Sequence, residues 1–543
     1  MINLAPIIFI VTTLIFLSAI AGRIKKIPYP ILLVFAGLII GFIPGVPLVS
    51  LDPEMVFLLF LPPLLYRAGW NTSWKDFQAS IAPISRLAIG LVLFTTISIA
   101  VVAHYFIPGM SWPVAFVLGA IVSPPDAVSA TSILNGMGLN RRIVTILEGE
   151  SLVNDASALI VYRYAIAAVV SSSFVLWKAG LQFLVVASGG VLIGFVLGYM
   201  LCMILKRIQN NPTVETTLLL LVPFVSYPLA ERFGVSGVLA VVSTGLVTSW
   251  RSSEVISYQG RTQSNAVWDM IVFLLNGVIF ILIGLQLSEV VATIEGYKIS
   301  ELVLYSLLIS VVAIVTRILF IAPAIWFPSL LGNKIHREEQ TFSWKNVVIL
   351  SWSGMRGVLS LATAMALPLV MENGTPLHQR KVILFITFGV ILITLVGQGL
   401  TLPVLIKMLG VGSSKEQEDE ERKLRLLVAN SSLDYINDTF KSKDPNEEVI
   451  QEIRKLYELR IGWLNGKDFQ KQDVNIQHKA DDTTFLERVI KGQLAVTDFK
   501  RKLLLKLYRD GAYSSANIRK LEKEMDLDES RLRSQLKIVR DDD

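Results

Sequence analysis

The sequence predicts an all-α polytopic membrane protein with about 13 transmembrane helices and a helical cytoplasmic C-terminal domain. Of the 543 residues, 53% are hydrophobic and only 17% are charged, and the mean hydropathy is +0.57. A soluble protein of this length carries more charge. Residues 1–410 consist of long apolar runs, while residues 411–543 are densely charged. We therefore expect a transmembrane domain at 1–410 and a soluble helical domain at 411–543.

Thirteen apolar stretches are each long enough for the roughly 20 residues that a helix needs to cross a bilayer. The first stretch has no basic segment before it, and "RIKK" follows it, so we expect a retained helix rather than a cleaved signal peptide. The predicted spans centre on residues 4–22, 28–45, 54–70, 84–106, 112–134, 141–169, 179–207, 212–231, 234–250, 267–287, 301–328, 345–371 and 381–407.

Basic residues are much more frequent in the loops after odd-numbered spans than in the loops after even-numbered spans. Because lysine and arginine accumulate on the cytoplasmic side, this asymmetry predicts an N-terminus outside and a C-terminal domain inside. The odd loops carry Arg23, Lys25, Lys26, Lys75, Arg86, Arg141, Arg142, Lys206, Arg207, Arg251, Arg261, Lys334, Arg337 and Lys345. The even loops carry Lys178, Arg232, Lys298, Arg380 and Lys381.

Cysteine and histidine usage excludes several classes of protein. The single cysteine, Cys202, excludes an internal disulfide framework and a thiol-rich metal site. The histidines are scattered, so a histidine metal cluster is not expected. They are His104, His336, His378 and His478. We expect no nucleic-acid partner, because the net charge of +6 reflects membrane topology. We also expect no cofactor.

The stretch "GESLVNDASALIV", residues 149–161, places ionisable groups in the interior of the sixth predicted span. Ser151 and Asp155 are four residues apart and share a helix face, with Asn154 beside them. These oxygen ligands suit a small hard cation, or a proton on the carboxylate. Glu150 lies about 140° round the helix from Asp155 and needs another partner. A structural polar cluster is the alternative, but an ionisable residue at this depth favours function.

The fifth span contains "SPPDAVSA", in which Asp126 follows Pro124 and Pro125. Two consecutive prolines remove two backbone donors and leave upstream carbonyls unpaired. Such backbone is tolerated in a membrane only where protein or a wet cavity satisfies it. Broken helices near the midplane form the ion sites of secondary transporters, while a simple proline kink is the alternative.

The twelfth span, "ILSWSGMRGVLSLATAMALP", contains Arg356 between Gly354 and Gly357, which weaken the helix and permit close backbone approach. A buried arginine needs a carboxylate, and Glu150 is the one without a partner in the sixth span. We therefore predict a structural ion pair between Glu150 and Arg356. Arg317 is a further intramembrane cation to which the sequence assigns no partner.

The motifs "GESLVNDA", "SPPDAVSA", "SGMRGVLSLATA" and "VGQGLTLPVL" together resemble the signatures of the sodium/proton exchanger family, the first cation/proton antiporter family, bacterial type. The resemblance extends over residues 1–410. It implies two inverted six-helix repeats with broken crossing helices, here the fifth and twelfth spans, and a homodimer. It also implies that Asp155 is the main cation and proton carboxylate, that Asp126, Ser151 and Asn154 belong to the site, and that Glu150 and Arg356 form the structural pair.

Two positions depart from the family pattern. Relatives usually have threonine before the fifth-span aspartate, where this chain has Pro125, so a threonine contact is missing. Many bacterial relatives have an acidic residue in the third span, where "LPPLLYRAGW" places Arg67. We expect Arg67 to line a cytoplasmic vestibule or to pair with another acid.

These residues favour a secondary antiporter that exchanges a monovalent cation, Na+ first and Li+ or K+ as alternatives, for H+ across the plasma membrane. One site holds a cation or a proton but not both, and Asn154 cannot ionise. By the pattern of the wider superfamily, an Asn–Asp pair implies electroneutral exchange. A potassium/proton antiporter, a membrane-embedded aspartyl enzyme using Asp126 and Asp155, and a passive cation channel are the alternatives. The aspartyl-protease motifs and a repeated filter motif are absent from the sequence.

The C-terminal residues 418–436 and 498–536 have apolar residues at helical spacing and predict amphipathic helices, with a turn at "DGAYSS". Regulation and dimer support are the functions that we consider for this domain. A solvated helical appendage is the alternative.

Overall fold

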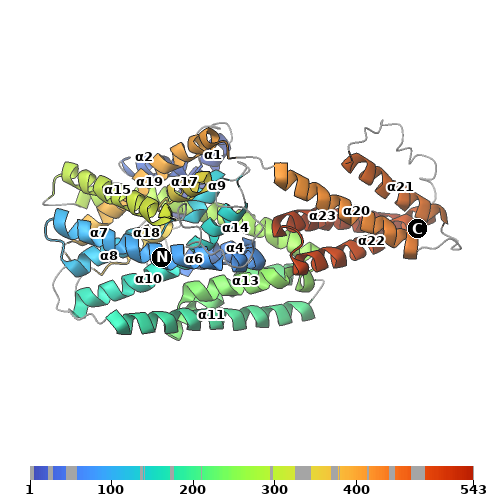
Figure 1. Cartoon of the computed structure of the whole chain (residues 1–543), viewed down its shortest axis with the longest axis horizontal. Coiled ribbons are helices and arrows are strands. Elements are labelled where there is room, and N and C mark those ends of the chain that lie inside the picture. The colour runs from blue at the N-terminus through green and yellow to red at the C-terminus, as the bar shows by residue number, and fades with distance from the viewer. Residues whose placement is uncertain are drawn as a thin grey trace. The chain divides into compact units, whose positions relative to one another are not determined.

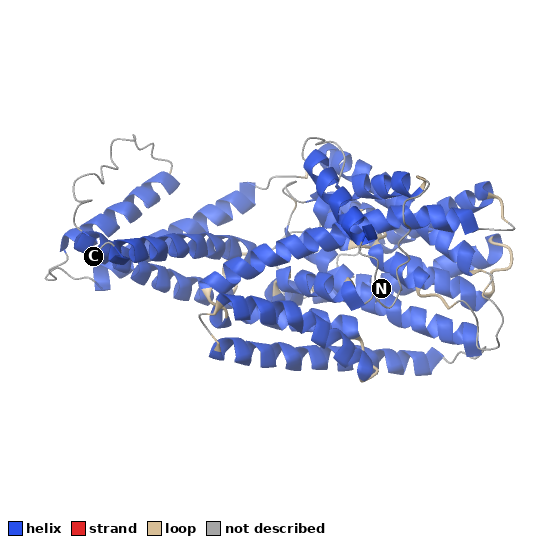
Figure 2. Cartoon of the chain, turned by 180° about the vertical axis from the view of Figure 1, so that it is seen from behind, coloured by secondary structure: helices blue, strands red, loops and turns tan. Residues whose placement is uncertain are grey.

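Helices make up all the regular structure in the described part of the chain, as Figure 2 shows. The computed structural model describes residues 5–21, 29–43, 58–134, 139, 141–171, 176–208, 211–293, 297–323, 344–368, 377, 379–411, 415–439, 447–465 and 483–541. The all-α prediction is confirmed there. Outside these ranges lie five of the basic loop residues and three of the histidines, namely Arg23, Lys25, Lys26, Lys334, Arg337, His336, His378 and His478.

The helices are numbered in chain order, and Figure 1 labels most of them. They are α1 (Ala5–Ala21), α2 (Tyr29–Gly41), α4 (Leu61–Asn71), α5 (Trp74–Ala79), α6 (Ile81–Ser85), the π-helix η1 (Arg86–Leu91), α7 (Val92–Phe106), α8 (Trp112–Val122), α9 (Ala127–Leu134), α10 (Arg141–Ser171), α11 (Leu176–Arg207), α12 (Pro212–Arg232), α13 (Gly237–Val255), α14 (Tyr258–Thr293), α15 (Ile299–Ile321), α17 (Trp344–Trp352), α18 (Val358–Met365), α19 (Arg380–Leu409), α20 (Lys415–Thr439), α21 (Glu447–Leu464), α22 (Thr483–Asp510) and α23 (Ser515–Asp541).

Every predicted span overlaps at least one of these helices. Among the described residues, seven helices are long and apolar enough to cross a membrane, and three shorter helices are also apolar. The protein is therefore a multi-span membrane protein of the predicted class. The fifth and twelfth predicted spans each consist of two short helices, α8 with α9 and α17 with α18. The total number of crossings and the inverted repeats stay predictions.

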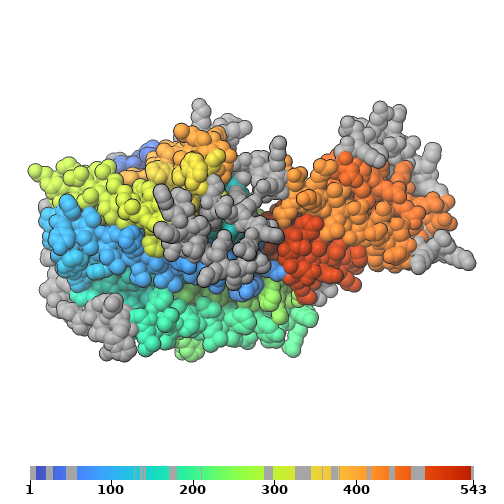
Figure 3. All heavy atoms as spheres, in the orientation of Figure 1, coloured from blue at the N-terminus to red at the C-terminus, as the bar shows by residue number. Residues whose placement is uncertain are grey.

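Most of the outward-facing side chains of α7 and α15 are apolar. These two helices pack against each other, and both contribute to the surface seen in Figure 3. Their exposed side chains include Leu93, Phe94, Ile97, Val303, Leu304 and Leu307. An apolar exposed face of this kind fits contact with lipid, in which helices satisfy their own backbone groups.

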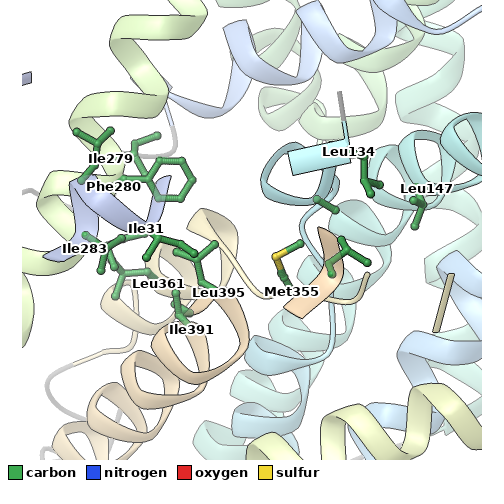
Figure 4. Close-up of a cluster of buried hydrophobic side chains, with 14 of the residues drawn as sticks. Ile31, Leu134, Leu147, Ile279, Phe280, Ile283, Met355, Leu361, Ile391 and Leu395 are labelled. Carbon is green, nitrogen blue, oxygen red and sulfur yellow. The ribbon is translucent and has the colours of Figure 1, made fainter. Parts of the chain in front are cut away.

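A hydrophobic cluster surrounds the break between α17 and α18. Met355 lies in this break and is fully buried. Figure 4 shows it between Leu134 and Leu147 on one side and Leu361 and Leu395 on the other, and all five belong to one core cluster. Close packing at this point holds the non-helical backbone in one position.

The chain divides into two compact units. The first unit comprises Met1–Ile204, Leu218–Arg251 and Val267–Ser413, and the second comprises Leu205–Thr217, Ser252–Ala266 and Ser414–Asp543. The second unit therefore contains more than the predicted soluble domain at 411–543, because two segments from the ends of long apolar helices belong to it. The functional boundary between the two predicted domains stays a prediction.

The second unit is a helical bundle built from α20, α21, α22 and α23. The predicted turn at "DGAYSS" is present: α22 ends at Asp510, α23 begins at Ser515, and Gly511 has a φ of 71°, which glycine tolerates best. Within the same unit, Arg261 at the start of α14 donates from Nε and Nη2 to the Asp526 carboxylate at 2.9 and 2.5 Å.

Lys500 on α22 is a buried ammonium group in this bundle. Its side chain is 7% exposed, and its Nζ lies 5.6 Å from the centre of the Tyr457 ring. Loss of hydration, reinforced by the nearby Arg460 guanidinium, lowers the pKa of Lys500 to about 8. The charged ammonium is therefore a source of instability at neutral pH.

We expect Lys500→Met to stabilise the second unit at pH 7 by on the order of 3 kcal/mol. Between pH 8 and the ordinary lysine value of 10.5, the folded state binds fewer protons than the unfolded chain, so the unfolding free energy of the natural protein rises with pH across this window. The variant lacks this rise. Thermal unfolding of the full chain at pH 7 and pH 10 measures both effects.

The control is Lys502→Met, which replaces an exposed lysine on the same helix. Equal unfolding midpoints for Lys500→Met and the natural protein at pH 7 would contradict the prediction.

Candidate ion site

The break between α8 and α9 follows from the two prolines. Pro124 and Pro125 have no N–H, so the helix cannot continue through them. The next amide, Asp126 N, does not bond back to Val122 O but donates to Met355 O at 2.7 Å. The upstream end of the break is therefore left with a free carbonyl that needs a donor.

Arg356, in the break between α17 and α18, supplies that donor. Its Nε donates to Val122 O at 2.6 Å, and its Nη1 donates to Gly354 O at 2.5 Å. The side chain is 2% exposed. Arg356 therefore satisfies carbonyls that the two broken helices leave unpaired.

The two breaks approach each other closely. Besides the bond from Asp126 N to Met355 O, the Asp126 carboxylate lies so near Gly357 that a Cβ at this position would collide with it. Glycine at 357 is thus required by close approach. The fifth and twelfth spans therefore contact each other at their breaks, and the predicted crossing of the two spans stays a prediction.

Asp155 and Ser151, on α10, both line a cavity of about 320 Å³. Pro124, Pro125 and Asp126 from the α8–α9 break line the same cavity. The helical spacing of four residues does place Asp155 and Ser151 on one face, as the sequence predicted. The cavity thus brings the carboxylates of Asp155 and Asp126 and the hydroxyl of Ser151 together beside non-helical backbone.

Asn154 faces the backbone of the break. It is fully buried, and its Nδ2 donates to Pro125 O at 3.1 Å. Its Oδ1 is buried and has no hydrogen-bond partner among the described residues. Asn154 therefore ties α10 to the broken helix and keeps one oxygen unused.

The Asp126 carboxylate is held locally by Ser129. Ser129 Oγ donates to Asp126 Oδ2 at 2.6 Å, and Ser129 N lies 3.4 Å from Oδ1. These bonds orient the carboxylate at the N-terminal end of α9, where the helix dipole favours negative charge.

Glu150 pairs with Arg317, so the prediction of a Glu150–Arg356 pair is wrong. Arg317 on α15 donates from Nη1 and Nη2 to the two carboxylate oxygens of Glu150 at 2.6 and 2.8 Å. Arg317 Nε donates to Leu350 O at 3.1 Å. Glu150 and Arg317 are each 1% exposed. Glu150 does point away from the cavity, as its position on the helix predicted.

Further polar residues line the cavity that sequence reasoning did not assign to the ion site, among them Glu148, Asn276, Asn71 and Arg67. Arg67 Nη2 also donates to Asp269 Oδ1 at 2.7 Å, so the expectation that Arg67 pairs with another acid is confirmed. Asn276 and Asp269 lie on α14, in a span without a recognisable motif. Glu148 lies two residues before Glu150, so its place in the same acidic stretch was the signal that could have found it.

Three comparisons with known proteins bear on this site. The family model for the sodium/hydrogen exchanger, transmembrane, matches residues 9–408. The chain is 33% identical over 477 residues to the sodium, potassium, lithium and rubidium/H+ antiporter of Bacillus pumilus, which covers 85% of this chain and 70% of that relative. It is 29% identical over 458 residues to the Na+/H+ antiporter ApNhaP of Aphanothece halophytica, covering 84% of this chain and 83% of that relative.

The fold also resembles a solved structure. The sodium proton antiporter MjNhaP1 from Methanocaldococcus jannaschii at pH 8 aligns with a TM-score of 0.57 and 21% identity, covering 74% of this chain and 97% of that chain. At this identity the likeness concerns the fold alone.

This multi-span helical membrane protein has carboxylates in a cavity lined by residues of two broken helices, and it belongs to the class of monovalent cation/proton antiporters. It is a transporter and not an enzyme. The chain belongs to the sodium/hydrogen exchanger family, as its motifs predicted.

Proposed function

We propose that this protein exchanges Na+ for H+ across the plasma membrane by competition of the two ions for Asp155. The observation that carries this proposal is that Asp155, Ser151 and Asp126 line one cavity beside two helix breaks that approach each other closely. Carboxylate, hydroxyl and freed carbonyl oxygens are hard ligands that suit an alkali cation.

Competition follows from the chemistry of a carboxylate in a confined cavity. A bound cation requires an ionised carboxylate, because an isolated charge in an apolar medium is costly. A bound proton neutralises the same group and removes its attraction for the cation. The site therefore carries either ion across, and a gradient of one drives the other.

The pair Asn154–Asp155 supports electroneutral exchange. Asn154 has no charge and is bound to Pro125 O, so it contributes fixed geometry rather than a second proton. If Asp155 is the one carboxylate that titrates, one proton exchanges for one monovalent cation. Ser129 orients the Asp126 carboxylate, which in this proposal carries no second proton.

Potassium/proton exchange is the second candidate. The Bacillus pumilus relative is named for sodium, potassium, lithium and rubidium, while the Aphanothece halophytica relative is named for sodium alone. The homodimer, the external N-terminus and the cytoplasmic C-terminal domain complete the proposal, and the loop charges support this orientation.

Purified protein in sealed vesicles tests the proposed function. A preset pH gradient should collapse when Na+ is added, with Li+ and K+ as comparison cations and choline as the inert control. Absence of any cation-dependent proton flux at all pH values tested would reject antiport by this chain.

We expect the balance point of exchange to be independent of voltage. Moving one charge is worth about 2.3 kcal/mol per 100 mV, so an electrogenic exchanger would shift its equilibrium ion ratio steeply. The measurement clamps vesicles at several potentials with potassium and valinomycin, after showing that K+ is not transported, and finds the Na+ gradient that balances a fixed pH gradient. A shift equal to one charge per cycle would show that a second carboxylate, Asp126 or Glu150, also carries a proton.

A further inference from the structure

The cavity that contains Asp155 also contains a guanidinium group. Arg67 lines it from α4, together with Asn71, which is one helical turn further along on the same face. The Arg67 side chain is 11% exposed. A fixed positive charge raises the electrostatic energy of any cation that enters the same cavity.

Asp269 holds this guanidinium from the neighbouring helix α14. Arg67 Nη2 donates to Asp269 Oδ1 at 2.7 Å. Val272 follows Asp269 by three residues and Asn276 follows it by seven, so the three share one helix face, and both Val272 and Asn276 line the cavity. Asp269 therefore lies one turn away from the cavity wall and holds Arg67 towards α14.

The two charges of this pair have different surroundings. The Asp269 side chain is 66% exposed, so solvent and salt screen its charge. The Arg67 side chain is largely buried, and its charge is screened less. Asp269 therefore cancels the effect of Arg67 on a cation in the cavity only in part.

We propose that Arg67 and Asp269 set the cation affinity of the site: Arg67 weakens cation binding at Asp155, and Asp269 limits this effect by neutralising the guanidinium and holding it against α14. The proposal rests on the proposed function, because it takes Asp155 as the cation site. It predicts opposite effects for loss of the two partners. If the pair only held α4 against α14, loss of Arg67 and loss of Asp269 would lower the stability and the transport rate by the same amount.

The test uses the full chain in vesicles and measures the half-saturating Na+ concentration and the maximal rate separately. Arg67→Gln should lower the half-saturating concentration roughly threefold to tenfold. Asp269→Asn should raise it by roughly twofold to threefold, and more strongly at low ionic strength. In the double variant, the effect of Asp269→Asn should disappear, because it acts through Arg67.

Two variants serve as controls. Arg67→Lys keeps the positive charge and should restore most of the natural half-saturating concentration. Arg163→Gln removes another pair of the first unit, with Glu231 at 2.7 Å, and Arg163 lies outside the described lining of the cavity. It should leave the half-saturating concentration unchanged.

The proposal is overturned if Arg67→Gln leaves the half-saturating concentration unchanged or raises it, or if Asp269→Asn has the same effect with and without Arg67. If Arg67→Gln does not fold, Asp269→Asn alone decides: a raised value supports the proposal, and an unchanged or lowered value overturns it. Flux that survives loss of Asp155 would instead reject the proposed function. These two failures are therefore distinguishable.

Discussion

Replacing Asp155 by Asn should abolish cation-driven proton flux, down to the leak of empty vesicles, while the protein still folds. Asp155 lines the cavity beside Asp126 and Ser151. The amide keeps the size of the side chain but can neither ionise nor exchange a proton. Cation binding and proton transport, the two halves of the cycle, are therefore lost together. Cation-dependent proton flux and cation binding to the purified protein measure the two halves separately.

Ser157→Ala is the matched control for this prediction. Ser157 lies on the same helix, is 3% exposed and donates to Val153 O, outside the described lining of the cavity. This variant should retain most of the natural flux. Asp126→Asn should also be severe, because the carboxylate faces the cavity and is oriented by Ser129. Near-normal sodium-driven flux in Asp155→Asn would show that another group carries the ions.

Hydropathy and local chemistry predicted the helices well, because a bilayer imposes simple rules on them. A spanning segment must be long, apolar and helical, and these properties are visible in the sequence. The prolines at 124 and 125 predicted a break at the right place, since missing N–H groups end a helix in any surroundings. The glycine at 511 marked the turn between α22 and α23 for an equally local reason.

The candidate site was predictable where it depends on one helix and not where it depends on two. Ser151 and Asp155 share a face by helical geometry alone, and both line the cavity. The contact between Asn154 and Pro125 O, and the approach of Asp269 to Arg67, depend on how separate helices pack. Spacing along one chain segment does not contain that information.

The partner of Glu150 was mispredicted for a physical reason. The sequence offers two intramembrane arginines, Arg317 and Arg356, and charge alone does not choose between them. The choice is decided by the carbonyl that the proline break leaves unpaired, because Val122 O needs a donor and Arg356 provides it. Arg317 is then the cation available for Glu150.

We expect that removing either partner of the Glu150–Arg317 pair destabilises the protein strongly. Both side chains are 1% exposed and share two hydrogen bonds of 2.6 and 2.8 Å. Glu150→Gln or Arg317→Gln leaves an uncompensated buried charge, which costs about 3–5 kcal/mol. The double variant should recover a large part of this loss, because no unpaired charge remains. Thermal unfolding of the natural protein, the two single variants and the double variant in detergent gives the coupling energy between the two positions.

A second cycle with Arg356 in place of Arg317 makes this test specific. Arg356 is equally buried, but its Nε and Nη1 donate to the carbonyls of Val122 and Gly354 rather than to Glu150. Arg356→Gln should therefore cost stability that Glu150→Gln does not restore, since those carbonyls stay unpaired. A coupling between Glu150 and Arg356 as large as that between Glu150 and Arg317 would contradict the pairing. It would mean that the two arginines share the carboxylate in solution.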